Sequence, residues 1–155
     1  MRPTTILALA VALLLAGLTA GAARAEDGAA VLAERQELMK QQGKDMKAVK
    51  DYLDDKAELA PAQSAAADLI QTMLKIPSEF PKDTGMEQFP KSEAKPVVWT
   101  EWDKFLAAQK TAAAKADALN AAFKGGDKAA ITAAFGDLGK NGCGGCHETF
   151  REKKT

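Results

Sequence analysis

Apolar residues recur at steps of three, four and seven along most of this chain, and this spacing is the strongest constraint on its fold. Between residues 29 and 53 they return every seven positions, at Leu32, Met39, Met46 and Leu53. Residues seven apart lie on one face of an α-helix, so the segment is predicted to be a helix with one apolar stripe. No segment alternates apolar and polar residues as a half-buried β-strand does. The chain is therefore expected to be all-α.

Three further helices are predicted from the same pattern. The second begins near Pro61, which suits a first helical turn, the third near Pro96, and the fourth after Asp127, a good N-cap residue. Gly125 and Gly126 are expected to end the third helix. The three stripes are Ala62, Ala66, Leu69, Met73 and Ile76; then Trp102, Phe105, Gln109, Ala112, Ala116, Leu119 and Phe123; and then Ile131, Phe135 and Leu138. Four amphipathic helices with mostly short connections predict an antiparallel four-helix bundle.

Residues 1–25 are predicted to be a cleaved secretory signal peptide. Arg2 precedes an apolar run over residues 6–18, and Ala23 and Ala25 place small side chains before the expected cleavage site. The run has 13 residues, fewer than the ~20 that a membrane-spanning helix needs. An uncleaved N-terminal anchor is the alternative. Residues 26–155 then form the mature domain, exported to a bacterial periplasm and free of the membrane.

The charge balance argues against a nucleic-acid-binding protein. The chain has 21 Lys and Arg residues and 21 Asp and Glu residues, and without residues 1–25 the count becomes 19 basic and 21 acidic. A domain that binds nucleic acid normally carries a basic patch and a positive net charge. Two cysteines and one histidine exclude a disulfide scaffold, and they also exclude a catalytic triad beside a separate metal site.

One connection between the predicted helices is unusually long. Residues 77–95 contain three prolines and two phenylalanines, Phe80 and Phe89, and show no helical period. A loop of this length is uncommon in a small domain and usually has a function. Two interpretations stay open: a plain crossover between helices, or a strap that packs its phenylalanines over a bound group.

A C-x-x-C-H pattern, the attachment signature of c-type haem, lies near the end of the chain at residues 143–147. On a helix, Cys143, Cys146 and His147 share one face. Both thiols can therefore form thioethers with the haem vinyl groups while the imidazole reaches the iron. Gly144 and Gly145 let the backbone approach the porphyrin. One covalently attached haem c is the expected cofactor, with His147 as the proximal ligand of its iron.

Two other chemistries use paired cysteines. A redox-active dithiol belongs at a helix start within a βαβ unit, whereas this chain has no predicted strand. A zinc site needs a second pair of ligands, and His147 is the only histidine. A thiol redox protein without haem stays as a third interpretation, behind the two haem functions described below.

The chain resembles cytochrome c′ and its low-spin relatives, the class II c-type cytochromes. The resemblance rests on Arg35, Met39, the loop rich in Pro, Gly and Phe, Trp99 after Lys95-Pro96, and a C-terminal C-x-x-C-H followed by Arg151. It implies a four-helix bundle with covalent haem over nearly the whole mature domain. One departure is an extra residue between Gly139 and Cys143, which is expected to form a bulge in the fourth helix.

The resemblance also implies roles for two residues of the first helix. In that family an arginine reaches a haem propionate, and the residue four positions later faces the iron on its distal side; here these are Arg35 and Met39. Arg35 lies on the apolar stripe, where an unpaired charge is costly, and a propionate or a surface glutamate can balance it. Met39 is interpreted either as an iron ligand or as a core residue. Arg151, four residues after His147, is expected to lie beside the proximal imidazole.

The main functional prediction is a periplasmic mono-haem cytochrome that transfers single electrons, with low-spin haem ligated by His147 and Met39. The alternative is a five-coordinate, high-spin cytochrome c′ that binds NO or CO. The expected partners are periplasmic redox proteins that dock weakly and transiently. No catalytic residue is predicted, so the protein is not expected to be an enzyme, and monomer and homodimer both stay open.

Overall fold

The computed structural model describes the backbone of residues 4–153 and the side chains of residues 27–153. The regular secondary structure of this part is helical, apart from an isolated bridge between Ala94 and Arg151, and residues 80–96 form a long loop without helix. The elements are α1 (Thr4–Leu53), α2 (Leu59–Lys75), the 3₁₀-helix η1 (Ile76–Glu79), α3 (Val97–Thr100), α4 (Trp102–Gly125), α5 (Lys128–Asp137), the π-helix η2 (Leu138–Gly144) and α6 (Gly145–Phe150).

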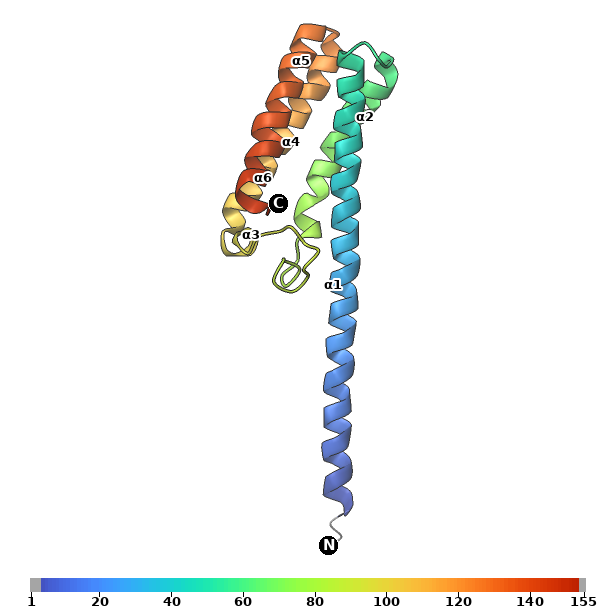
Figure 1. The fold of residues 1–155 in the computed structure, drawn as a ribbon, viewed down its shortest axis with the longest axis vertical. Helices are drawn as coiled ribbons and strands as arrows, with labels where there is room; N and C mark the ends of the chain where they lie inside the picture. Colours follow the sequence, from blue (N-terminus) through green and yellow to red (C-terminus); the bar gives the residue numbers. More distant parts are fainter. Residues whose placement is uncertain (1–3, 154–155) are drawn as a thin grey trace.

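The helices form the predicted four-helix bundle (Figure 1). α1 packs against α2, α2 against α4, and α4 against α5 and η2. α5, η2 and α6 follow one another as the fourth helix of the bundle, and α1 continues well beyond the bundle toward its N-terminal end. The all-α class and the bundle architecture predicted from the sequence are confirmed.

Residues 4–25 of the predicted signal peptide lie in the extending part of α1. The side chains of residues 1–26 are outside the described part of the chain, so cleavage after residue 25 stays a prediction. None of the helices over the described residues combines the length and the apolar character needed to cross a membrane.

The apolar stripes of α2 and α4 form the core. Every predicted stripe position of α2 and its continuation into η1 is buried, and so are all those of α4 except the half-buried Trp102. Gly126 has a φ of 74° and ends α4, and the Asp127 side chain accepts a hydrogen bond from the Ala129 N–H and caps α5. The local signals predicted from glycine and aspartate are therefore confirmed.

The stripe of α1 is less completely covered. Val49 is fully buried and Leu32 nearly so, whereas Met39 and Met46 are only half-buried. Both methionines line a cavity, so the stripe of α1 serves as a wall as well as a core face. This explains why the same seven-residue spacing gives different degrees of burial along one helix.

The third predicted helix is divided. The chain leaves helical geometry at Glu101, with φ −123° and ψ 46°, so that α3 and α4 are separate. The break allows Trp99 to donate its indole N–H to the carbonyl oxygens of Phe80 and Pro81, both at 3.0 Å, while Phe105 faces the core. The apolar spacing alone predicted one helix from near Pro96, because nothing in that spacing marks the break at Glu101.

The fourth predicted helix contains the expected bulge. Residues Leu138–Gly144 form a π-helix between α5 and α6, at the position of the extra residue. A π-helix accommodates additional residues without ending the helix. Gly142 makes this segment fit, because a Cβ atom there would lie 2.9 Å from the Leu138 side chain and 3.4 Å from the Ala112 Cα atom of α4.

Candidate functional site

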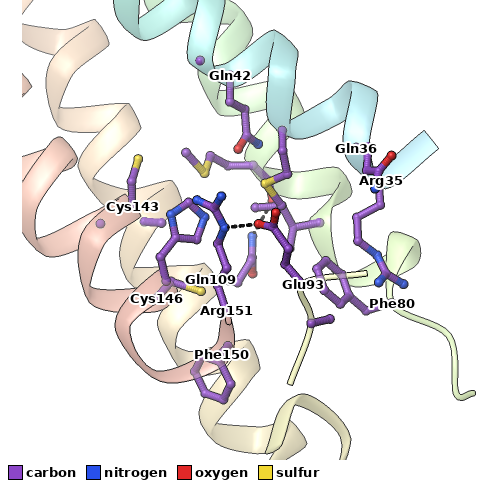
Figure 2. A pocket seen from close by; sticks show the side chains of 18 of the residues that line it. Arg35, Gln36, Gln42, Phe80, Glu93, Gln109, Cys143, Cys146, Phe150 and Arg151 are labelled. Carbon is purple, nitrogen blue, oxygen red and sulfur yellow. Dashed lines mark hydrogen bonds and ion pairs between the residues drawn. The ribbon is translucent and has the colours of Figure 1, made fainter. Parts of the chain in front are cut away.

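A cavity of about 850 Å³ opens between α1 on one side and η2 and α6 on the other (Figure 2). Its volume lies in the upper part of the ~300–1,000 Å³ range of ligand sites. α2, η1, both ends of the long loop and α4 complete the walls. The lining side chains are mainly apolar, among them Leu32, Met39, Met46, Met73, Ile76, Phe80, Ala94, Phe105, Ala112 and Phe150.

Cys143, Cys146 and His147 come together on one wall of this cavity, as their spacing predicted. Cys143 lies in the last turn of η2, and the other two lie at the start of α6. Figure 2 shows both cysteines across the cavity from Arg35 and Gln36. This wall therefore presents two thiols and one imidazole to a large, mainly apolar space.

The two thiols are free and half-buried. Burial raises the pKa of Cys143, and burial followed by the charge of Cys143 raises the pKa of Cys146 to about 11. Reactive dithiols need the opposite, a lowered thiol pKa. The environment of the cysteines therefore argues against the thiol redox interpretation and fits thiols that are consumed in thioether bonds.

His147 is held as a neutral imidazole. Burial lowers its pKa most, the charge of Arg151 lowers it further, and Glu93 opposes both. A neutral imidazole keeps the nitrogen lone pair with which histidine binds a metal. The environment of His147 therefore suits the proximal ligand predicted from the sequence.

Arg151 lies near His147, and its Nε atom donates to a Glu93 carboxylate oxygen at 2.5 Å. The bridge between Ala94 and Arg151 aligns the two chains, and the Lys95 N–H donates to the Phe150 carbonyl oxygen at 3.0 Å. The end of the loop is thus tied to the end of α6. Glu93 is a cavity residue that sequence reasoning missed, because it lies 58 residues from its partner.

The loop also confirms part of the strap interpretation. Phe80 is buried and lines the cavity. Phe89 does not; its ring lies against Gly28 of α1, where a Cβ atom would be 2.5 Å from the ring edge. One of the two predicted phenylalanines therefore covers the cavity, and the other fastens the loop to α1.

Arg35 lines the cavity and is 5% exposed. Its guanidinium donates to the carbonyl oxygens of Glu79 (2.7 Å) and Thr84 (3.0 Å) and to the Thr84 hydroxyl, and it stacks 4.1 Å from the Phe80 ring centroid. Burial lowers its pKa to about 10, against the opposing charge of Glu79. The loop thus compensates the buried charge, and the predicted contact with a propionate stays a prediction.

Met39 lines the α1 wall, together with Gln42 and Gly43. A Cβ atom at Gly43 would meet nothing within 4 Å. Gln42 is buried, and its Nε2 atom has no hydrogen-bond partner among the described residues. Sequence reasoning identified Met39 but missed Gln42, because only apolar residues were counted on the α1 stripe, although Gln42 lies three residues from Met39 on the same face.

These residues fit a covalently bound haem. The donor set is a pair of protonated thiols beside a neutral imidazole, and it faces an apolar cavity large enough for a macrocycle. Phe80, Phe105 and Phe150 line the same space and supply aromatic surface. Arg35 and Gln36 lie on its far side (Figure 2).

Known proteins are similar to this chain in sequence and in fold. Residues 30–151 match the family model described as Cytochrome C'. A cytochrome c′ of Pararhodospirillum photometricum is 39% identical over 122 residues, covering 76% of this chain and 93% of that protein. A cytochrome c-556 of Agrobacterium tumefaciens is 36% identical over 125 residues, covering 78% and 96%.

Two solved structures have the same fold. The crystal structure of cytochrome c′ from Rubrivivax gelatinosus has a TM-score of 0.69 at 31% identity and covers 79% of this chain and 94% of that chain. A nitric oxide complex of a cytochrome c prime variant from Alcaligenes xylosoxidans has a TM-score of 0.72 at 22% identity and covers 82% and 97%. The chain therefore belongs to the cytochrome c′ family of class II c-type cytochromes, haem proteins of electron transfer and ligand binding that carry covalently attached haem c.

Proposed function

We propose that this protein is a periplasmic mono-haem cytochrome c′ that keeps its iron five-coordinate and binds small diatomic molecules such as NO and CO. The observation that carries the proposal is the cavity itself, which has the single histidine of the chain on one wall and a mainly apolar lining. Relatives named cytochrome c′ support it, as does the nitric oxide complex of the Alcaligenes xylosoxidans protein.

The cavity wall that carries Cys143, Cys146 and His147 is called the attachment wall, and each of its residues has a part in this proposal. Cys143 and Cys146 hold the haem through thioethers, and His147 ligates its iron. Glu93 and Arg151 border the imidazole and set its electrostatic environment. The bound haem supplies an iron centre that changes oxidation state and takes a sixth ligand.

The other walls exclude water and close the site. Phe80, Phe105 and Phe150 make the cavity apolar, and the buried Arg35 holds the loop that carries Phe80 against α1. An apolar cavity favours neutral gases over hydrated anions, because a charged ligand would lose its hydration there.

Low-spin electron transfer is the second candidate. Met39 favours it, since its thioether lies on the wall across from His147 and four residues after Arg35. A relative named cytochrome c-556 also matches most of the chain. In this candidate Met39 closes the sixth position, and the protein passes electrons without binding gases.

The test is the visible spectrum of the reduced holoprotein with and without CO. The protein is expressed as the full chain, with its proposed signal peptide, in a host with haem-maturation machinery. We expect a broad high-spin spectrum that shifts when CO is added. Sharp low-spin bands that ignore CO would instead establish the electron carrier, and failure of haem attachment in a host that matures other c-type cytochromes would overturn both candidates.

Export is tested in the same culture. The mature protein is expected in the periplasmic fraction, starting at Glu26, as measured by fractionation and intact mass. A product that keeps residues 1–25 and sediments with membranes would overturn the proposed cleavage.

A further inference from the structure

Gln42 is a buried glutamine whose side-chain N–H groups are unused within the described protein. It is 8% exposed and points from α1 into the cavity (Figure 2). Its Nε2 atom has no hydrogen-bond partner among the described residues. Buried polar groups are nearly always hydrogen-bonded, so a donor aimed into a ligand cavity indicates an acceptor on the ligand.

The other glutamines near the cavity do not share this property. Gln36 donates to the Lys91 carbonyl oxygen at 3.2 Å, and Gln109 donates to the Met73 carbonyl oxygen at 2.8 Å. Both of these residues also line the cavity. Among these three glutamines, only Gln42 therefore has a side-chain amide donor without an acceptor, so lining the cavity does not by itself leave a glutamine without one.

The carboxylate one turn along α1 does not satisfy Gln42. The Oδ2 atom of Asp45 is itself without a hydrogen-bond partner, and the two side chains do not bond to each other. Asp45 is not among the residues that line the cavity, and its Oδ1 atom accepts from Gln41 at 2.9 Å. The Gln42 amide thus faces the cavity while Asp45 belongs to a separate polar cluster.

We propose that Gln42 donates a hydrogen bond from Nε2 to the diatomic molecule bound at the haem iron, and so favours NO over CO. This inference rests on the proposed function. Gln42 and Met39 lie three residues apart on α1 and line the same wall. Bound NO carries more negative charge than bound CO, so a neutral donor stabilises it more.

Two variants remove the donor without adding charge. Gln42→Leu keeps most of the side-chain volume without adding a thioether that could bind iron, and Gln42→Val provides a second apolar replacement in case one of them matures poorly. Gln41→Leu is the matched control, because it removes the neighbouring glutamine, which lies outside the cavity lining and donates to Asp45. All four holoproteins are compared in the reduced state.

The primary measurement is the infrared stretching frequency of bound CO, which falls when a donor approaches its oxygen. We expect a higher frequency in both Gln42 variants than in the unsubstituted protein and the Gln41 variant. The ratio of NO affinity to CO affinity, from association and dissociation rates, should fall, by at most about fivefold, because one neutral hydrogen bond is worth about 1 kcal/mol and the donor also stabilises bound CO to a smaller extent.

The outcomes separate this inference from the function on which it rests. If CO binds but its frequency and the NO to CO ratio are the same in all four proteins, Gln42 is not a donor to the ligand and the proposed function stands. If the unsubstituted protein binds neither gas, the proposed function fails and the role of Gln42 fails with it.

Discussion

The face of α1 that meets the cavity carries side chains of different chemistry within two turns. Met39 and Gln42 line the cavity, whereas Asp45 turns toward α2 and the Asp68 carboxyl group. Arg35 contacts the loop. Single residues of this helix therefore have different surroundings, which makes each of them testable alone.

Met39→Ala tests ligation at the residue scale. In the five-coordinate protein we expect the high-spin spectrum to stay unchanged. CO affinity should rise by roughly tenfold, because relieving contact with a large side chain is worth about 1–3 kcal/mol. The measurement is CO titration followed by visible spectroscopy. A change from low-spin to high-spin bands on substitution would instead identify Met39 as the sixth ligand.

Asp45 predicts a pH-dependent stability. Burial, and then the charge of Asp68, raise the Asp45 pKa from 3.8 to about 6. The folded state therefore keeps a proton that the unfolded state loses, and the free energy of unfolding should fall as pH rises from about 4 to about 6. Lys44 and Gln41, which lower this pKa, oppose the effect without reversing it.

Asp45→Asn should remove that pH dependence. We expect the variant to be more stable above pH 6 by up to about 3 kcal/mol, because it removes the buried carboxylate charge whose pKa is raised from 3.8 to about 6. Glu34→Gln, at an exposed position of the same helix, should leave the profile unchanged. Urea denaturation of the holoproteins between pH 4 and pH 8 measures both. Parallel pH profiles for Asp45→Asn and the unsubstituted protein would contradict the assignment.

At the scale of elements, η2 decides how the attachment wall meets the bundle. The π-helix occupies Leu138–Gly144 and packs against α4. It leads directly into α6, so the extra residue is absorbed before Cys146 and His147 rather than between them. The spacing of the C-x-x-C-H pattern is thereby preserved on one face.

Two glycines of the fourth helix give opposite predictions. Gly142→Ala should destabilise the protein by about 1–3 kcal/mol, because its Cβ would crowd Leu138 and Ala112. Gly136→Ala has open space around its Cβ position and should stabilise by about 0.5–1 kcal/mol through helix propensity. Thermal denaturation of the two holoproteins compares them, and equal shifts in the same direction would show that η2 does not pack as described.

At the scale of the whole molecule, the cavity separates α1 from the fourth helix along part of the bundle. The loop bridges the two sides, since Arg35 binds it from α1 and the end of α6 binds it through Lys95 and Glu93. A space of about 850 Å³ without its occupant leaves apolar surface uncovered. The haem is therefore expected to be part of the core.

Preventing haem attachment should destabilise the entire bundle. We expect the same chain, produced without maturation machinery, to melt at least ~10 °C lower than the holoprotein, which corresponds to several kcal/mol for a domain of this size. Circular dichroism at 222 nm measures both forms. The Cys143→Ser, Cys146→Ser double variant should behave like the apoprotein even in the maturing host. Equal melting temperatures would mean that haem binds to a bundle already complete without it.

The sequence by itself determined most of the helices, the end of α4, the cap of α5 and the attachment motif, because each depends on residues at most a few positions apart, whereas the break between α3 and α4 did not show in the apolar spacing. The stripes of α2 and α4, the Asp127 cap, and the grouping of Cys143, Cys146 and His147 all follow from local helical geometry. The π-helix was expected from the resemblance to class II cytochromes, relative to which this chain has one additional residue between Gly139 and Cys143.

Tertiary structure alone decided the rest of the site. Glu93 reaches Arg151 across 58 residues, and Arg35 finds Thr84 across 49. Likewise, the packing of α1 against its neighbours buries Gln42 without an acceptor for its amide, whereas the amides of Gln36 and Gln109 each donate a hydrogen bond to a carbonyl oxygen. The physical reason is that hydrogen-bond satisfaction and burial depend on which distant groups come close, and no local spacing encodes that.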